Sequence, residues 1–300
     1  MQKSRLSHVL LAVLGSAVAI WFLIPVVFSY ASRQFAQTAI LYSQCERRSI
    51  ALQALVFRDE VLVRAPCPGC LELLVSDGER VSKGVPIAKI KDAGIERTII
   101  SPRAGIVYFN LDGLEEMLSV DRPDTLRTIP DARPLSRSAG DVLSKGDPVA
   151  RVVDNLDPVV LRVTPGDDAV TPEQCKPGAT WTLCIDQQDY RGRVVASLPG
   201  EQTTLFLRLE RYPDYCLRER LLACQAVVGE LDGLLVPRSA IIRRGEQEGI
   251  LVVYKGSSQW VPVEIVGQLN DMVSIKGAGL SEGINYVVNP RWVKEGAMLR

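Results

Sequence analysis

The sequence predicts a mainly β protein with one N-terminal transmembrane helix, and three observations support this. Residues 9–30 form an apolar segment without a charged residue. From Leu55 onward, short runs rich in Val, Ile and Leu alternate with Gly, Pro, Asp and Asn, which is typical of many short strands. One such stretch occurs twice, which indicates that two similar halves build one domain.

The apolar segment 9–30 is long enough to anchor the chain in a membrane. A helix of this length, at about 1.5 Å per residue, crosses a hydrocarbon core of about 30 Å. Lys3 and Arg5 precede it, which favours a cytoplasmic tail over residues 1–8 and domains outside the cytoplasm. The alternative is a cleaved signal peptide, with Ser29-Tyr30-Ala31 as the cleavage site, but the apolar run exceeds a signal core of roughly 7–15 residues. We therefore expect a single-pass protein of the cell membrane that contacts the lipid bilayer through this helix.

Composition excludes several classes of function. The chain has 35 Lys+Arg and 35 Asp+Glu residues, so its formal net charge is zero and nucleic acid is not an expected partner. Its single histidine is His8, so the β-rich part has no histidine base or metal ligand. The carboxylate pairs Glu115-Glu116 and Asp167-Asp168 are expected to be solvated turn residues. We predict no catalytic residues, no metal site and no enzyme activity.

The β-rich part begins with a repeated motif. Residues 31–54 are expected to form a juxtamembrane linker or a short helix. The sequence GERVSKGVPIAKI, from Gly78, is then matched by GDVLSKGDPVARV, from Gly140. Because each half has too few strands to bury a core alone, we expect both halves to pack face to face within residues 55–155.

An insert over residues 114–138 interrupts the second half. It is polar, contains three prolines and carries charges of both signs. These features predict a solvated loop that the fold does not need, and the alternative is a loop that binds a partner.

The paired halves resemble the biotinyl/lipoyl-like barrel-sandwich hybrid of the membrane fusion, or HlyD-like, family of periplasmic adaptors. The stretch GLLVPRSAII, from Gly233 to Ile242, and the later GLSEGINYVVNP are similar to the last domain of that family. The resemblance implies a barrel-sandwich domain over 55–155, a small β-barrel over 156–232 and a membrane-proximal-type β-domain over 233–300.

The resemblance also implies a function. Such adaptors associate with an inner-membrane transporter, here an ABC-type or other permease of an efflux or secretion assembly, and they form homo-oligomers. Adaptors that bridge two membranes carry a long α-helical hairpin between the two halves. Only Lys91 to Thr98 lies there in this chain, so the family resemblance implies a shortened form. The alternative is a cell-envelope or division-associated scaffold that uses the same fold without a transporter.

Two positions invite a cofactor or redox interpretation. Domains of this fold can carry biotin or lipoyl on a lysine, but the offset from Ser101-Pro102 places the carrier position at Gly94, so we expect no cofactor. Cys67 and Cys70 have the spacing of a redox pair but no helix pattern follows them. They are either structural thiols, a local disulfide or thiol pair, or half of a metal site.

Overall fold

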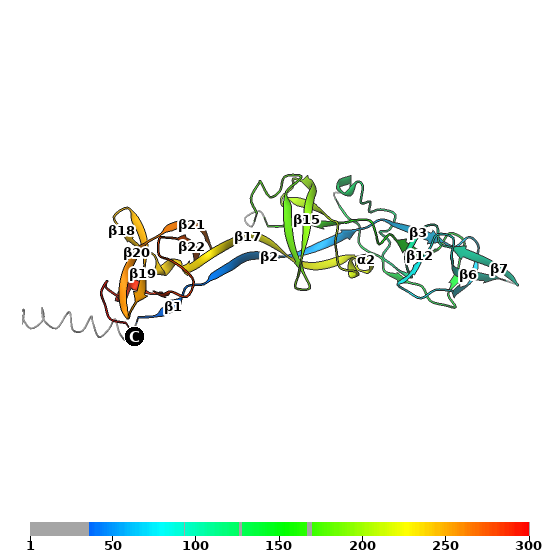
Figure 1. Cartoon of the computed structure of the whole chain (residues 1–300). Coiled ribbons are helices and arrows are strands. Elements are labelled where there is room, and N and C mark those ends of the chain that lie inside the picture. The colour runs from blue at the N-terminus through cyan, green and yellow to red at the C-terminus, as the bar shows by residue number, and fades with distance from the viewer. Residues whose placement is uncertain (1–35, 93, 126–127, 167–169, 300) are drawn as a thin grey trace, which may run out of the picture. The chain divides into compact units, whose positions relative to one another are not determined.

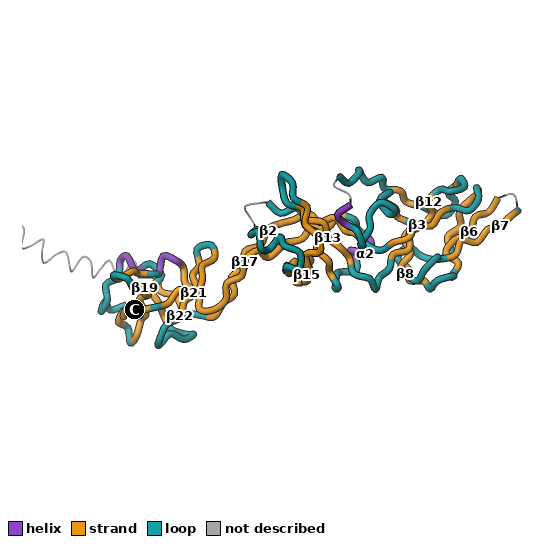
Figure 2. The backbone as a smooth tube through the Cα atoms, turned by 90° about the horizontal axis from the view of Figure 1, so that it is seen from above, coloured by secondary structure: helices purple, strands orange, loops and turns teal. Residues whose placement is uncertain are grey.

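The structure, a computed structural model, describes residues 36–92, 94–125, 128–166 and 170–299. These residues are mainly β-strands, with very little helix (Figures 1 and 2). None of the helices in this described part is long and apolar enough to cross a membrane. The predicted anchor at 9–30, with its tail at 1–8, lies outside the described residues and stays a prediction.

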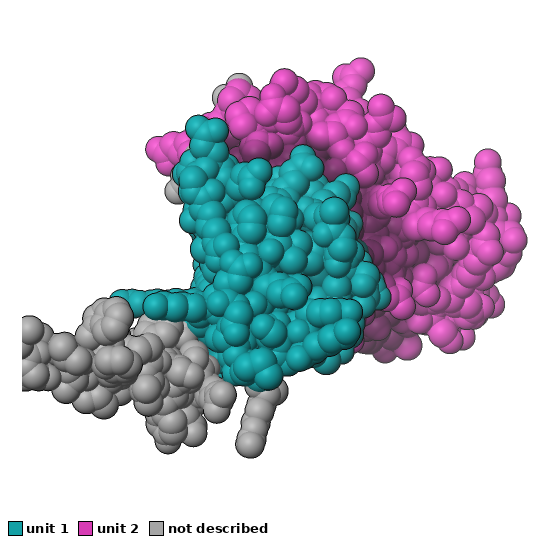
Figure 3. Space-filling view, turned by 60° about the vertical axis from the view of Figure 1, so that its left-hand side comes forward, with its two compact units in different colours: residues 1–48, 229–300 teal, residues 49–228 magenta. Residues whose placement is uncertain are grey.

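The chain divides into two compact units, shown in different colours in Figure 3. Unit 1 comprises residues 1–48 and 229–300, and unit 2 comprises residues 49–228. The predicted start of the β-rich part at Leu55 needs a correction. Residues before Leu55 already form strands, and these strands contribute to both units.

The first part of unit 2 is a sandwich of two four-stranded antiparallel sheets. One sheet has the order β3 (Glu60–Arg64), β12 (Pro148–Val153), β8 (Gly105–Tyr108), β5 (Glu79–Val81). The other has the order β11 (Val142–Leu143), β4 (Gly69–Leu73), β6 (Pro86–Asp92), β7 (Ile95–Ile100). Each sheet thus combines strands from both predicted halves, and the prediction that the halves form one domain is confirmed.

The repeated motif explains how the halves join. Its two Lys-Gly turns place Gly84 and Gly146 at φ values of 85° and 91°, which glycine adopts at no steric cost. Gly84 donates its N–H to the Ser101 carbonyl of the other half, and Gly146 donates to the Ala65 carbonyl, both at 2.8 Å. The halves therefore pair reciprocally through equivalent residues.

The shared core of the sandwich is largely the predicted one. Ile87, Ile90, Val107, Val149 and Val152 are fully buried in one apolar cluster. Ile106, which was expected to join them, packs instead in a separate small cluster with Tyr108, Val153 and Leu217. Its side chain points away from the sandwich core because successive strand residues face opposite sides.

The second part of unit 2 is a closed β-barrel. Its strand order is β14 (Thr180–Ile185), β15 (Gln188–Leu198), β16 (Thr204–Leu209), β13 (Val159–Val163), β2 (Ser43–Phe57), β17 (Leu221–Pro237), and β17 pairs again with β14. The short helix α2 (Tyr215–Arg218) precedes β17. The predicted small barrel is present, and closure leaves the core residues Leu161, Leu183 and Leu207 fully buried.

The linker predicted over residues 31–54 is wrong for its described part. Residues 38–40 form β1 (Thr38–Ile40), and most of the rest belongs to the long strand β2. The start of β2 reads SQCERR and is mostly exposed, so it lacks the apolar alternation that would have predicted a strand. Backbone pairing along its sheet, rather than burial of its side chains, sustains this part of the strand.

Unit 1 contains a separate set of strands in addition to the N-terminal part of β2 and the C-terminal part of β17. They are β1, β18 (Ile242–Arg244), β19 (Gln247–Tyr254), β20 (Ser257–Pro262), β21 (Glu264–Leu269), β22 (Met272–Lys276) and β23 (Asn285–Val287), with short 3-10 turns η3 (Arg238–Ala240) and η4 (Pro290–Trp292). β1 pairs with β23, so the N-terminal strand completes this domain. The predicted domain over 233–300 therefore also needs residues 38–40 and Leu41, which is fully buried in its core.

Candidate functional site

The most unusual feature of unit 2 is a buried network of charged side chains where the sandwich meets the barrel. Its members are Arg58, Glu60, Asp112, Arg151 and Arg220. The side chains of Arg58 and Glu60 are 0% exposed, and the other three are at most 14% exposed. Charged residues are almost never buried to this degree unless they are paired.

The members come from four separate places in the sequence. Arg58 follows β2 and Glu60 begins β3, whereas Arg151 lies in β12 of the sandwich. Asp112 follows β9 (Asn110–Leu111), and Arg220 precedes β17 of the barrel. The network therefore forms only when the sandwich and the barrel are both folded.

The carboxylates contact all three arginines. Arg58 Nε donates to Glu60 at 2.9 Å, and Arg220 Nε donates to Asp112 at 2.8 Å. Arg151 Nη1 lies 3.1 Å from Asp112 and 3.5 Å from Glu60, and Arg220 Nη2 also bonds to Glu60. Each carboxylate thus bridges guanidinium groups from both domains.

Backbone carbonyls around α2 accept further arginine protons, whereas the buried Arg151 Nε has no hydrogen-bond partner. Arg58 Nη1 donates to the carbonyls of Cys216 and Glu219 at 3.0 and 2.9 Å. Arg151 Nη2 donates to the Arg218 carbonyl at 2.7 Å. The last carbonyls of a helix lack intrahelical donors, so these arginines satisfy groups that would otherwise be buried without a partner.

The arginines differ in their electrostatic balance. Burial lowers the pKa of Arg58 to about 10, despite the attraction of Glu60, and the nearby Arg220 and Arg151 lower it further. Burial would also lower the pKa of Arg220, but Glu60 and Asp112 outweigh it and the net pKa is raised. Burial acts to raise the pKa of Asp112, yet Arg220 and the Leu114 N–H more than compensate and the net pKa is lowered. Asp112 is therefore held as a carboxylate.

A further buried carboxylate, Glu115, supports the loop that carries Asp112. Glu115 is buried, and its Oε1 accepts the Asp112 N–H at 2.6 Å, while Asp112 Oδ1 accepts the Leu114 N–H at 2.8 Å. The expectation that Glu115-Glu116 is a solvated pair is wrong for Glu115. Only Glu116 is exposed, and it bonds to Arg64 at 2.7 Å. This arrangement resembles a capping box, in which reciprocal bonds fix the start of a turn.

The network connects the sandwich to the barrel and has a structural role. It contains no histidine, thiol or hydroxyl that could act as a nucleophile or base, and every carboxylate is occupied by guanidinium or backbone donors. Sequence reasoning missed it. The one available signal was Arg151, a charged residue inside the apolar run Val149 to Val153, because an arginine in a buried strand needs an acidic partner.

The predicted carrier position lies in the tight turn between β6 and β7. Gly94 has φ 87°, which favours glycine, and β7 begins directly after it at Ile95. Lys91, on β6, bonds to Glu72 at 2.7 Å and lies 3.5 Å from Glu96. The strands follow one another without space for a helical hairpin. The prediction that no cofactor is attached stays a prediction.

The two cysteines with redox-like spacing lie at the entry to the sandwich. Cys70 is on β4 and exposed, and Cys67 precedes the strand and is partly buried. Both are free thiols in this structure. Neither belongs to a group of potential metal ligands among the described residues. The three interpretations, as structural thiols, as a thiol pair or as half of a metal site, stay predictions.

Two groups of side chains in the described part could offer three ligands to a metal ion. Asp59, Asp154 and Asp157 converge in unit 2, but Arg103 bonds to Asp59 at 2.5 Å and also to Asp154, so two of the three carboxylates already pair with a cation of the protein. A second group, in unit 1, combines a thiol with two carboxylates.

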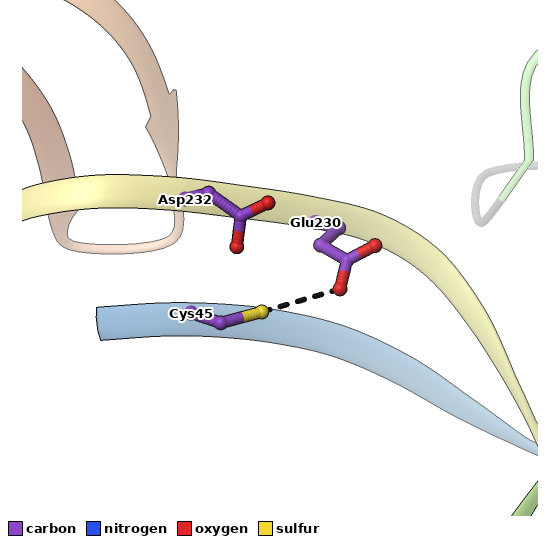
Figure 4. Close-up of side chains that lie close together, drawn as sticks. All are labelled: Cys45, Glu230 and Asp232. Atoms are coloured by element: carbon purple, nitrogen blue, oxygen red, sulfur yellow. Dashed lines mark hydrogen bonds between the residues drawn. The ribbon is translucent and has the colours of Figure 1, made fainter. Parts of the chain in front are cut away.

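Cys45 on β2 faces Glu230 and Asp232 on β17 (Figure 4). The thiol donates to Glu230 at 3.2 Å, and Glu230 also accepts from Arg47 at 2.9 Å. The hydrogen bonds to Asp232 and Glu230 raise the pKa of Cys45 to about 11. The thiol is therefore protonated at neutral pH although it is exposed, and the group acts as a cross-strand polar contact.

We expect this contact to slow the alkylation of Cys45. In Glu230→Gln/Asp232→Asn, the carboxylates no longer stabilise the thiol proton, so the pKa falls and the rate of reaction with iodoacetamide at pH 8 should rise about tenfold for each unit of the fall. Peptide mapping by mass spectrometry measures the rate at each cysteine. Cys70 is the internal control and should react at an unchanged rate. A rate at Cys45 that does not change would contradict the assigned hydrogen bonds.

The sheet topology shows that unit 2 consists of a barrel-sandwich hybrid followed by a closed β-barrel. Residues 60–154 match the family model described as "RND related, barrel-sandwich hybrid domain". The match covers the sandwich alone, and the resemblance to membrane fusion proteins that the sequence predicted is confirmed. No curated protein matches the sequence.

Several solved structures show a weak overall likeness. ZneB from Cupriavidus metallidurans is 15% identical, with 86% of this chain and 93% of that chain covered and a TM-score of 0.40. MacA from Actinobacillus actinomycetemcomitans is 14% identical, with 84% and 99% covered and a TM-score of 0.38. The membrane fusion protein Spr0693 from Streptococcus pneumoniae R6 is 10% identical, with 61% and 100% covered and a TM-score of 0.33. Scores at this level do not establish a common arrangement of the whole chain.

Proposed function

We propose that this chain is a membrane-anchored, non-enzymatic adaptor of a transport assembly. The observation that carries the proposal is the match of residues 60–154 to the RND-related barrel-sandwich family. The β-barrel and the β-domain that accompany this sandwich follow the order expected for a membrane fusion protein. The single histidine, His8, leaves the β-domains without the commonest catalytic base, which agrees with a role in assembly.

The proposed topology places the β-domains outside the cytoplasm. It rests on the uncharged segment 9–30, which is preceded by Lys3 and Arg5. The proposed partner is an inner-membrane transporter, either ABC-type or another permease, and the chain forms a homo-oligomer around it.

The short β6–β7 turn shapes this proposal. The turn joins β6 (Pro86–Asp92) to β7 (Ile95–Ile100) directly, so the sandwich ends where longer adaptors would extend a helical hairpin. An adaptor of this form suits an envelope in which no second membrane has to be reached. The buried network that joins sandwich and barrel would let unit 2 act as one rigid spacer within the assembly.

The topology predicts which reporters are active. Alkaline phosphatase fused after Arg300 should be active, because it folds only after export, and a green fluorescent protein fusion at the same position should be dark. Deletion of residues 9–30 should reverse both results. A dark phosphatase fusion with a bright fluorescent fusion would contradict the proposed orientation.

The transport role needs a separate test. The full-length chain, purified in mild detergent under native expression, should retain a multi-span permease. Recovery of cell-envelope or division proteins without a permease would instead support the scaffold function. The two experiments are independent, so the topology can hold when the transport role fails.

A further inference from the structure

A basic groove lies on the outer face of the β-barrel in unit 2. It has a volume of about 800 Å³, and three arginines and one glutamate line it: Arg191, Arg193, Arg208 and Glu210. Gly192 and Val194, which alternate with the arginines along β15, are buried, so the arginines all face solvent. The groove carries a surplus of two positive charges in a chain whose net charge is zero.

Two of the arginines lie side by side on neighbouring strands, where their like charges repel. Arg193 on β15 is directly opposite Arg208 on β16, and like charges at opposite positions destabilise a sheet. Arg191 is two residues along the same strand and therefore on the same face. Arg208 bonds to Glu210 at 3.3 Å. Within the described part of the chain, the side chain of neither Arg191 nor Arg193 makes a hydrogen bond or ion pair.

Val195 adds an apolar contact to the groove. It continues the alternation of Arg191 and Arg193 along β15 and is 39% exposed at the groove. The register between β15 and β16 shifts at this point, between Val194 and Ala196. The surface therefore offers two unpaired guanidinium groups, a third held by Glu210, and one valine side chain.

We propose that this groove binds an acidic, extended segment of a partner protein. Guanidinium groups bind carboxylates through paired, charge-assisted hydrogen bonds. Arg191 and Arg193 are two residues apart on one strand, so they match carboxylates at alternate positions of an extended segment, with spacing of about 6.6–6.8 Å. Val195 then contacts an apolar residue of the same segment.

The geometry favours a protein partner over a lipid surface. The arginines line a concavity, and a flat layer of headgroups would not reach into it. Glu210 lies among them, which opposes a uniformly anionic surface but suits a segment of mixed residues that is read position by position. The proposal goes beyond the transport role, since such a segment can belong to a permease or to an envelope scaffold.

The test uses the full-length chain in mild detergent and a fluorescein-labelled ten-residue peptide of alternating glutamate and threonine. Fluorescence anisotropy gives the Kd. Arg191→Gln/Arg193→Gln should raise the Kd about tenfold or more, because two charge-assisted contacts are lost. Arg80→Gln/Arg97→Gln removes the same charge from exposed strand positions of the sandwich and should change the Kd less than twofold.

A second readout separates binding from folding. Arg193→Gln removes the like-charge contact with Arg208, so its thermal midpoint should be equal to or higher than that of the wild type. A lower midpoint would show that the arginine serves the fold and would overturn the proposal. Equal weakening in the Arg80/Arg97 control, or failure of the wild type to bind the peptide, would also overturn it. So would displacement of the peptide by soluble dihexanoyl phosphatidylglycerol but not by dihexanoyl phosphatidylcholine, because the site would then be a lipid site.

Discussion

Asp112→Asn should destabilise unit 2 by about 3–5 kcal/mol, because it leaves a buried group of arginines without one of its carboxylates. The asparagine keeps an oxygen that can accept the Leu114 N–H, so the substitution removes mainly charge. What is lost is the attraction of Asp112 for Arg220, Arg151 and Arg58, which it contacts at 2.8, 3.1 and 3.4 Å. The free energy of unfolding, measured by urea titration with intrinsic fluorescence, tests this.

Asp121→Asn is the matched control, because Asp121 is an exposed carboxylate in the insert that follows Asp112. Its free energy of unfolding should stay within about 0.5 kcal/mol of the wild type. If both variants lose the same small amount, the network does not hold the sandwich to the barrel.

The pKa of Asp112 also predicts a pH dependence. Its pKa is lowered from 3.8 in the folded protein, so the carboxylate contributes stability that is complete above about pH 4. That contribution is lost as pH falls through the folded pKa, because the unfolded state then binds the proton more readily. Between pH 4 and pH 2, the free energy of unfolding of Asp112→Asn should therefore fall less steeply than that of the wild type.

The sandwich could be predicted from the sequence because its determinants are local and occur twice. Each copy of the Ser-Lys-Gly turn lies between apolar runs, and the copies are similar enough to show that the halves pair. The start of β2 could not be predicted in this way. Cys45, Arg47 and Arg48 are polar and exposed, and their extended conformation depends on pairing with strands more than a hundred residues away.

The charge network was beyond sequence reasoning for a similar reason. In the sequence, Arg58-Asp59-Glu60 looks like a solvated turn, and Asp112 looks like the end of a strand. The partners Asp112 and Arg220 are 108 residues apart, and Glu60 and Arg220 are 160 apart. These side chains are buried because the sandwich packs against the barrel at this point. No local sequence pattern specifies that contact. The same reason explains why Glu115 was taken for a solvated residue.

The insert over 114–138 was expected to be dispensable, and the structure corrects this. Leu114 and Leu118 are buried against Phe57, Val160 and Phe206 of the barrel. Further along, β10 (Leu135–Ser136) pairs with β9. The interpretation as a solvated loop is therefore wrong for the described parts that contact the core. The apolar residues of the insert are separated by charged residues and prolines. They therefore show neither the helical nor the strand periodicity that would have predicted a buried face.

Leu118→Ala should reveal this contribution. It removes a buried side chain from the cluster with Phe57 and Phe206, and such substitutions cost about 2–5 kcal/mol through lost burial and the cavity left behind. Met117→Ala is the control in the same turn, since Met117 is 47% exposed and should change the free energy of unfolding by no more than about 0.5 kcal/mol. Urea unfolding of both variants measures the difference. If Leu118→Ala is as mild as Met117→Ala, the turn does not support the barrel, and the insert is the dispensable loop that its composition suggested.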